Sequence, residues 1–197
     1  MTKDWKGKPR DLFRLRGATG HSDHSREYLD YYATEPLATE LLLKLEQFDK
    51  NIWECACGQG HISEVLVKNN YNVRSTDLVD RGYGQGGIDF IKEKDLWDGD
   101  IITNPPCRYA HEFIEHALKV VTDGHKIAVF LRITFLEGKK RRKLYNKYPP
   151  KLIYVASTRL KCSLGGKFNE MPESAACYAW FIWEKGFTGV TQLKWFN

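Results

Sequence analysis

A strand–turn–helix pattern at residues 51–69 constrains the fold of this chain more than any other feature. Residues 51–55 form a short apolar run, a turn with Gly58 and Gly60 follows, and residues 60–69 continue with helical spacing. A strand that leads into a helix usually pairs in parallel with the next strand, because the helix carries the chain back to the starting edge. The pattern therefore predicts an α/β sheet that is mostly parallel.

Similar patterns continue along the chain. Apolar side chains recur at helical spacing over 110–121, which predicts an amphipathic helix there. The last two expected strands are joined by a polar loop, 157–174, without a helix, so we expect that pair to be antiparallel. Further strands are expected at 71–77, 100–103, 126–131, 152–156 and 176–183, and a further helix at 36–48.

The length and composition fit one globular domain. The chain has 197 residues, of which 42% are hydrophobic and 28% charged. We divide it into an irregular basic arm at 1–30 and a single domain at 31–197. The longest apolar run, 175–183, is far shorter than the roughly 20 residues of a membrane helix.

Cysteine usage and the N-terminus both predict a cytoplasmic protein. The five cysteines form no CxxC pair, which argues against a disulfide scaffold or a zinc site. The N-terminus is charged from Lys3 onward and lacks an apolar signal core. His111 and His116 lie five positions apart, too far around a helix to share a metal, so no metal is expected.

The net charge of +5 is unevenly distributed. Residues 1–26 carry +4 and residues 138–151 carry +7, so the rest of the chain is acidic. Two basic segments on an acidic body favour a polyanion partner, most simply nucleic acid. Tyr145 and Tyr148 lie within the second segment and could stack on bases. A solvated helix face is the alternative interpretation of the same run.

The turn after the first strand has features of a nucleoside-binding loop. Gly58 and Gly60 would let a ligand approach the backbone at a helix N-terminus. Asp77 ends the next strand, 19 residues after Gly58, where an acid binds ribose hydroxyls in doubly wound folds. Ser63 replaces the third glycine of the dinucleotide fingerprint. The pattern indicates a ribose-bearing ligand without a diphosphate, although a tight structural turn would also explain the glycines.

A second motif, Asn104-Pro105-Pro106-Cys107, follows the strand at 100–103. Strand ends of an open α/β sheet face the ligand crevice, so this motif is expected to lie near Gly58. The prolines fix the backbone, and the Asn104 side-chain oxygen and the Pro105 carbonyl are then two fixed acceptors. Such a pair suits a substrate NH₂ group whose lone pair attacks a methyl group. A helix-initiating turn with an Asn cap is the structural alternative.

Taken in order, these motifs resemble S-adenosylmethionine-dependent methyltransferases that act on amino groups. The chain is most similar, over roughly residues 30–185, to small DNA adenine-N6 methyltransferases of bacteriophages. The resemblance implies a Rossmann-like class I methyltransferase fold. Its sheet would be mostly parallel and seven-stranded, with an antiparallel last strand and helices on both faces. It also implies S-adenosylmethionine as cofactor, and cytoplasmic action, in a bacterial host if the protein is phage-encoded.

The resemblance assigns roles to individual residues. The catalytic motif would be Asn104, Pro105, Pro106 and Cys107. The methionine end of the cofactor would contact Glu54, Ala56, Cys57, Gly58 and Gly60. The ribose would contact Asp77 beside Leu78, the adenine ring Asp89 and Phe90, and the carboxylate Tyr32, Thr34, Glu35 and Pro36.

Cys107 departs from the family, which has an aromatic residue here that stacks on the target base. Tyr109 or Phe135 could replace that ring, the substrate could be single-stranded, or the protein could methylate poorly. A Pro-Cys pair also occurs in cytosine-C5 methyltransferases, where the thiolate is the nucleophile. The other motifs of that class are missing, and Asn104 would have no evident role there.

The basic residues Lys139, Lys140, Arg141 and Arg142 are the expected phosphate contacts. We therefore predict methyl transfer to adenine N6 in nucleic acid, with DNA favoured over RNA and the oligomeric state open. An RNA adenine or a protein glutamine amide presents a similar NH₂ group. A non-enzymatic protein that binds the cofactor or nucleic acid, disabled at Cys107, is the alternative from another class.

Overall fold

The computed structural model describes residues 31–164, 166, 168 and 176–197. The expected basic arm at 1–30 lies outside the described residues. None of the helices in the described part of the chain has the length and apolar character that crossing a bilayer requires.

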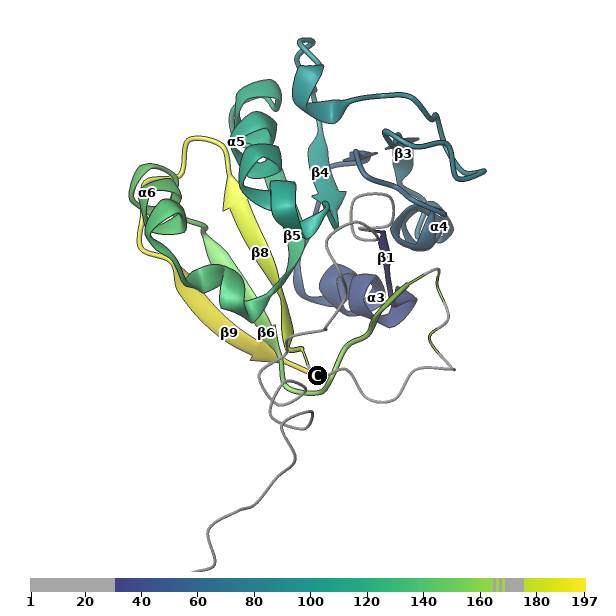
Figure 1. Cartoon of the computed structure of the whole chain (residues 1–197). Helices are drawn as coiled ribbons and strands as arrows, with labels where there is room; N and C mark the ends of the chain where they lie inside the picture. The colour runs from purple at the N-terminus through teal and green to yellow at the C-terminus, as the bar shows by residue number, and fades with distance from the viewer. Residues whose placement is uncertain (1–30, 165, 167, 169–175) are drawn as a thin grey trace, which may run out of the picture.

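A seven-stranded sheet forms the centre of the molecule (Figure 1). Its order is β3-β2-β4-β5-β8-β6-β9, and β8 is antiparallel to both neighbours while the other pairs are parallel. This confirms the mostly parallel sheet and its expected antiparallel strand. The strands are β2 (Asn51–Glu54), β3 (Asn72–Ser75), β4 (Asp100–Thr103), β5 (Lys126–Arg132), β6 (Leu152–Ala156), β8 (Tyr178–Glu184) and β9 (Gln192–Phe196).

Three strands were not expected from the sequence. β9 follows the antiparallel strand and adds a parallel edge beside β6, so β8 is not the last strand of the chain. β1 (Tyr32–Thr34) and β7 (Cys162–Leu164) form a separate antiparallel ribbon. Each of these two strands has only three residues, and β7 lies inside the segment interpreted as a polar loop.

Helices cover both faces of the sheet (Figure 1). On one face lie α3 (Pro36–Leu45) and α4 (His61–Lys68). On the other lie α5 (Ala110–Val120) and α6 (Lys139–Lys147). Short 3-10 turns complete the set: η1 (Phe90–Lys92), η2 (Cys107–Tyr109) and η3 (Ile133–Leu136).

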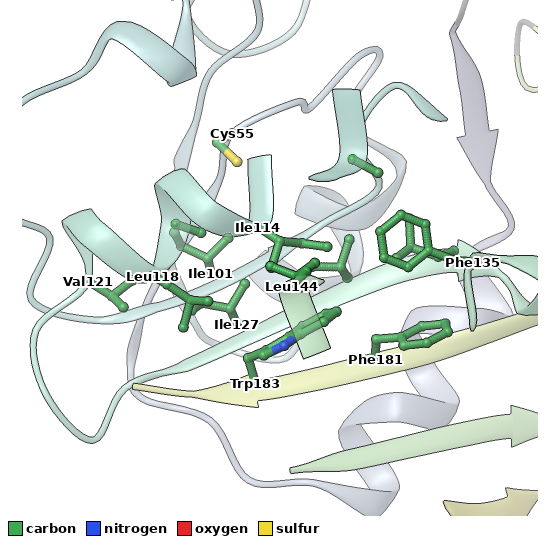
Figure 2. Close-up of a cluster of buried hydrophobic side chains, with 14 of the residues drawn as sticks. Cys55, Ile101, Ile114, Leu118, Val121, Ile127, Phe135, Leu144, Phe181 and Trp183 are labelled. Atoms are coloured by element: carbon green, nitrogen blue, oxygen red, sulfur yellow. The ribbon is translucent and has the colours of Figure 1, made fainter. Parts of the chain in front are cut away.

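The alternation of side chains along β5 divides the core into two layers. Ile127 and Val129 face α5 and α6, whereas Ala128 and Phe130 face α3 and α4. Figure 2 shows the first layer, where Ile114 of α5 lies above Ile127 and Trp183. Burial on both faces explains why the central strands read as continuous apolar runs.

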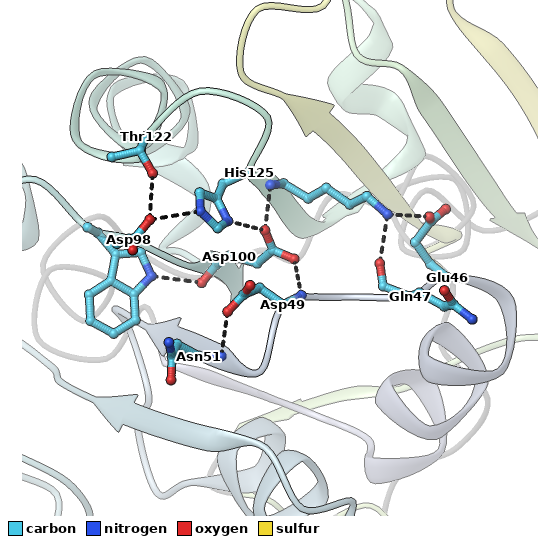
Figure 3. Close-up of polar contacts among 10 residues, drawn as sticks. Glu46, Gln47, Asp49, Asn51, Asp98, Asp100, Thr122 and His125 are labelled. Atoms are coloured by element: carbon cyan, nitrogen blue, oxygen red, sulfur yellow. Dashed lines mark hydrogen bonds and ion pairs between the residues drawn. The ribbon is translucent and has the colours of Figure 1, made fainter.

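A polar network fixes the start of β4 (Figure 3). The Asp100 carboxylate is 3% exposed and accepts main-chain N–H bonds from Asp49 and Lys126, each at 2.7 Å. His125 Nδ1 lies 3.1 Å from the same carboxylate. The start of β4 is thereby held, and the strand delivers Asn104 at its other end.

Candidate functional site

The crevice at the carboxyl ends of β2 and β4 is the place where the sheet topology favours a ligand. After β2 the chain crosses to β3 on one side, and after β4 it crosses to β5 on the other. Loops that diverge in this way leave a crevice between them. A hollow of about 60 Å³ lies here. This first hollow is lined by Tyr31, Tyr32, Ala33, Thr34, Glu54, Ala56, Cys57, His61, Ile62, Asp77, Arg81, Asn104 and Pro106.

The structure thus brings together about half of the residues predicted for the cofactor. They come from four separate segments: the β1 strand, the loop after β2, the end of the β3 segment and the loop after β4. The predicted residues that line the first hollow are Tyr32, Thr34, Glu54, Ala56, Cys57, Asp77, Asn104 and Pro106.

Gly58 and Gly60 both adopt positive φ angles, +56° and +88°. A Cβ at Gly58 would lie 2.0 Å from the ring of Tyr31, and one at Gly60 would lie 2.5 Å from the ring of Tyr83. Glycine is therefore required at both positions by the turn and by close-packed aromatic rings. The sequence predicts that a ligand comes close to the backbone at these two glycines. In this structure the rings of Tyr31 and Tyr83 lie there.

Glu54 lies at the bottom of the first hollow and is 2% exposed. Its carboxylate accepts a hydrogen bond from the Ser63 hydroxyl, which also lies 2.7 Å from the hydroxyl of Ser75. Burial raises the pKa of Glu54 to about 8, against the lowering effect of the Ser63 hydrogen bond. The serine that replaces the third fingerprint glycine is thus the partner of this acid.

Asp77 connects two loops of the site. Its carboxylate accepts the main-chain N–H of Gly58 at 2.8 Å and that of Val79 at 2.9 Å. Each carboxylate oxygen keeps a further lone pair for a ligand hydroxyl. Leu78 beside it is 63% exposed, which offers an apolar surface next to the acid.

Asn104 is oriented by the β1–β7 ribbon. Its side-chain Nδ2 donates to the Tyr32 carbonyl at 2.9 Å and to the Thr34 hydroxyl at 3.0 Å. The Pro106 carbonyl accepts the N–H of Tyr109 at 2.9 Å. The Asn104 Oδ1 and the carbonyl of buried Pro105 remain as the candidate acceptors of the motif.

A second hollow of about 420 Å³ begins on the other side of the same loop. Pro106 lines the first hollow and its neighbour Cys107, which is exposed, lines the second. The motif therefore stands between the two hollows. The second hollow is lined by Cys107, Arg108, His111, Glu112, Phe135, Glu137, Gly138, Lys139, Lys140 and Arg141.

Two predicted adenine contacts lie elsewhere. Phe90 is 2% exposed and packs edge-on against Trp53, with ring centroids 5.0 Å apart. Asp89 pairs with Lys92 at 2.9 Å and does not line the first hollow. The apolar core holds the Phe90 ring, so a contact between this ring and the cofactor remains a prediction. The exposed side chain of Leu78 is better placed to contact the adenine ring.

The predicted carboxylate contacts Glu35 and Pro36 are also absent from the lining of the first hollow. Glu35 accepts the main-chain N–H of Lys161 at 2.8 Å, which ties it to the ribbon strand β7. Pro36 is the first residue of α3, as expected from its fixed φ.

The expected base-stacking residues differ in accessibility. Phe135 is 6% exposed, and the Arg141 guanidinium lies 4.6 Å above its ring. The Tyr145 hydroxyl donates to the Phe135 carbonyl at 2.7 Å, and its ring packs on the core, so its prediction as a stacking residue is wrong. Tyr109 is 46% exposed and is the accessible ring beside Cys107.

Of the four predicted phosphate contacts, Arg141 is partly engaged within the protein. Its Nη1 donates to the carbonyls of Thr134 and Glu137 at 2.9 and 2.8 Å. Lys139 and Lys140 are exposed at the start of α6, and both line the second hollow. Arg142 is exposed on the same helix.

Sequence reasoning missed Tyr31, His61 and Arg81, which all line the first hollow. It also missed Arg132, a half-buried arginine whose cross-strand partner is Tyr178. These residues carry no local motif, and only the folded sheet brings them to the crevice. In the described part of the chain no three His, Cys, Asp or Glu side chains cluster as metal ligands would.

Comparisons with known proteins identify the fold. No family model and no curated protein sequence matches the chain. A structure described as a candidate RNA methyltransferase from Pyrococcus horikoshii is 12% identical, with a TM-score of 0.58 over 90% of this chain and 98% of its own. The M protein of the type I restriction enzyme EcoKI is 15% identical, with a TM-score of 0.57 over 92% of this chain and 48% of its own.

An S-adenosylmethionine-dependent O-methyltransferase from Thermotoga maritima is 12% identical, with a TM-score of 0.51 over 78% of this chain and 66% of its own. At such low identities these similarities establish a methyltransferase-like α/β fold. They leave the reaction to be argued from the site.

Proposed function

We propose that this protein is an S-adenosylmethionine-dependent methyltransferase that methylates the N6 amine of adenine, with DNA as the favoured substrate. The observation that carries the proposal is the orientation of Asn104. Its Nδ2 donates to three protein groups, the Tyr32 carbonyl, the Thr34 hydroxyl and the Cys162 sulfur, so its Oδ1 is the atom that can accept from a substrate amine. The motif that contains it separates two hollows, one for each reactant.

The first hollow fits the cofactor in charge. S-adenosylmethionine carries a cationic ammonium and a ribose, and it supplies an electrophilic methyl group when bound. Glu54 at the bottom of the hollow would take the ammonium, and Asp77 would accept the ribose hydroxyls. Leu78 would cover the adenine, since it is exposed beside Asp77.

The protein acts on the target amine by holding it. Asn104 Oδ1 and the Pro105 carbonyl would each accept one N6–H, which localises the amine lone pair for in-line attack. Positioning of this kind needs neither a covalent intermediate nor a metal ion. The excess proton on the methylated nitrogen then leaves to solvent or to an acceptor of the motif.

The second hollow favours nucleic acid over a protein substrate. Arg108, Lys139 and Lys140 line it, and the start of α6 lies beside it. Phosphate groups are held by such cations and by helix N-termini. The similarity to a restriction-enzyme M protein and to a candidate RNA methyltransferase supports the same class of substrate.

Methylation of cytosine C5 through Cys107 is the second candidate, because this thiol is exposed at the edge of the second hollow. That reaction gives no role to the observed orientation of the Asn104 side chain. The two chemistries give different products, so the product itself decides between them.

The test uses purified protein, S-adenosylmethionine, and unmethylated DNA or RNA in separate reactions, with nucleosides identified by mass spectrometry. N6-methyladenine is expected with DNA, and Asn104→Ala should abolish it while cofactor binding remains. Asn72→Ala, on the exposed edge strand β3, is the matched control and should retain activity. C5-methylcytosine, or full activity in Asn104→Ala, would overturn the proposal.

A further inference from the structure

Arg81 lies in the first hollow without a complete set of protein partners. Its guanidinium lies 4.6 Å above the ring of Tyr31. Its Nε atom is buried, and no acceptor for it exists among the residues that the structure describes. A buried N–H without an acceptor is costly, and a ligand anion is one group that can supply the acceptor.

Tyr31 provides a rigid base for this guanidinium. Its hydroxyl accepts the main-chain N–H of Gln59 at 3.1 Å and lies 3.3 Å from His61 Nδ1. Its ring rests against Gly58, where even a Cβ would not fit. The Tyr31 ring therefore cannot move closer to the loop, and the Arg81 guanidinium above it stays in the first hollow.

The charges of the hollow single out Arg81 as its anion-binding residue. Glu54 and Asp77 are acids, and they would repel a carboxylate. Burial lowers the pKa of His61, which disfavours its charged form. Among the described residues that line the first hollow, Arg81 is thus the permanent cation.

None of the residues expected to hold the cofactor carboxylate is a cation. Tyr32 and Thr34 offer only a hydroxyl as side-chain donor, and the Glu35 carboxylate is an acid that accepts the main-chain N–H of Lys161. A planar guanidinium, in contrast, can hold a carboxylate with two parallel N–H bonds.

We propose that Arg81, supported by the ring of Tyr31, binds the α-carboxylate of the methionine moiety of the cofactor. This inference rests on the proposed function, because it presumes S-adenosylmethionine in the first hollow. It assigns the two ends of the amino acid to opposite charges: the ammonium to Glu54 and the carboxylate to Arg81. The site should therefore select strongly against a cofactor analogue that lacks only the carboxylate.

The test compares S-adenosylmethionine with decarboxylated S-adenosylmethionine by calorimetry at one pH and salt concentration. The wild-type protein should bind the decarboxylated analogue roughly 10- to 100-fold more weakly. Arg81→Met should weaken binding of S-adenosylmethionine by a similar factor and remove the preference between the two ligands. Arg81→Lys keeps the charge without the planar fork and should fall between them.

Lys94→Met serves as the control, because it removes an exposed cation outside the first hollow and should leave both affinities unchanged. Melting curves of each variant show whether it is folded.

The outcomes separate this inference from the proposed function. If folded Arg81→Met still prefers S-adenosylmethionine as the wild type does, the carboxylate binds elsewhere and the inference is wrong, while the methyltransferase proposal stands. If the wild type binds S-adenosylmethionine but does not distinguish the analogue, the inference is equally wrong. If the wild type binds neither ligand, the proposed function fails and the inference fails with it.

Discussion

The side chain of Asn104 is hydrogen-bonded to the main-chain carbonyl of Tyr32, 2.9 Å away and 72 positions earlier in the chain. The bond joins the end of the central strand β4 to the short ribbon strand β1. Since Thr34 of the same strand accepts a second bond from this amide, both side-chain hydrogens point toward the ribbon. The ribbon thereby determines which atom of Asn104 faces a substrate.

We first predict that loss of the Thr34 hydroxyl slows methyl transfer without weakening cofactor binding. Thr34→Val removes one of the three hydrogen bonds that orient Asn104, so kcat should fall roughly tenfold, the equivalent of about 1.4 kcal/mol. Thr34→Ser keeps the hydroxyl and should recover most of the rate. Equal kcat for the Val and Ser variants would show that this bond does not position Asn104.

The raised pKa of Glu54 gives a second prediction, for cofactor affinity against pH. A carboxylate binds the ligand ammonium, but burial keeps Glu54 neutral below a pKa of about 8 in the free protein. Affinity should therefore rise by about tenfold per pH unit below that pKa, until the ligand ammonium itself loses its proton at about pH 8. Calorimetry from pH 6 to about 7.5 measures the rise, and Glu54→Gln should be weaker and flat over that range.

The raised pKa of Glu54 affects folding stability in the opposite direction, because stability falls as the pH rises. The folded pKa of Glu54 lies above its ordinary value of 4.5, so its contribution to stability is fully present below about pH 4.5 and is lost as pH rises through 8. Glu54→Gln removes that loss. Above pH 8 the variant should melt at a higher temperature, relative to wild type, than it does at pH 5; parallel curves would contradict the assignment.

The sequence predicted the elements whose formation depends mainly on residues close together in the chain. The glycine turn before α4 and the amphipathic helix α5 are where the periodicity of the sequence placed them. Ribbon strands β1 and β7 were missed because each is stabilised by a partner about 130 positions away, not by its own three residues.

The candidate site shows the same limit. The positions of Glu54, Asp77 and Asn104 followed from strand ends, because parallel strands of one sheet converge at their carboxyl edge. Phe90 shows a different limit. A phenylalanine ring could contact the cofactor or pack in the core equally well, and only the folded structure shows that this ring packs against Trp53.

The third prediction concerns the far end of β4. Asp100→Ala would leave the buried N–H groups of Asp49 and Lys126 without an acceptor, so unfolding free energy should fall by about 2–4 kcal/mol. Asp98 contacts the same His125 but is 90% exposed, so Asp98→Ala should change stability by less than about 0.5 kcal/mol. Urea unfolding of both variants tests the contrast; equal losses would refute it.

The fourth prediction separates the amine mechanism from thiol chemistry. Cys107→Ala should retain N6-methyladenine formation within severalfold, because the thiol forms no bond to the substrate in the proposed reaction. Cys107→Tyr adds a ring at the edge of the second hollow and should tighten substrate binding, since a base stack contributes about 1–3 kcal/mol. Loss of all methylation in the Ala variant would favour the nucleophilic role.

The last prediction concerns the cations at the start of α6. If Lys139 and Lys140 contact two phosphates, replacing both by Ala should lower the slope of log affinity against log salt by about 1.8 for duplex DNA. Affinity at low salt should fall with it, whatever the base sequence, because phosphate contacts carry no sequence information.

The matched control is Lys44→Ala with Lys68→Ala. These lysines are exposed on α3 and α4, which cover the opposite face of the sheet. The control removes the same net charge and therefore tests whether total charge alone sets the binding. An equal decrease in slope for both pairs would mean that nucleic acid is attracted by the whole protein and is not held at the second hollow.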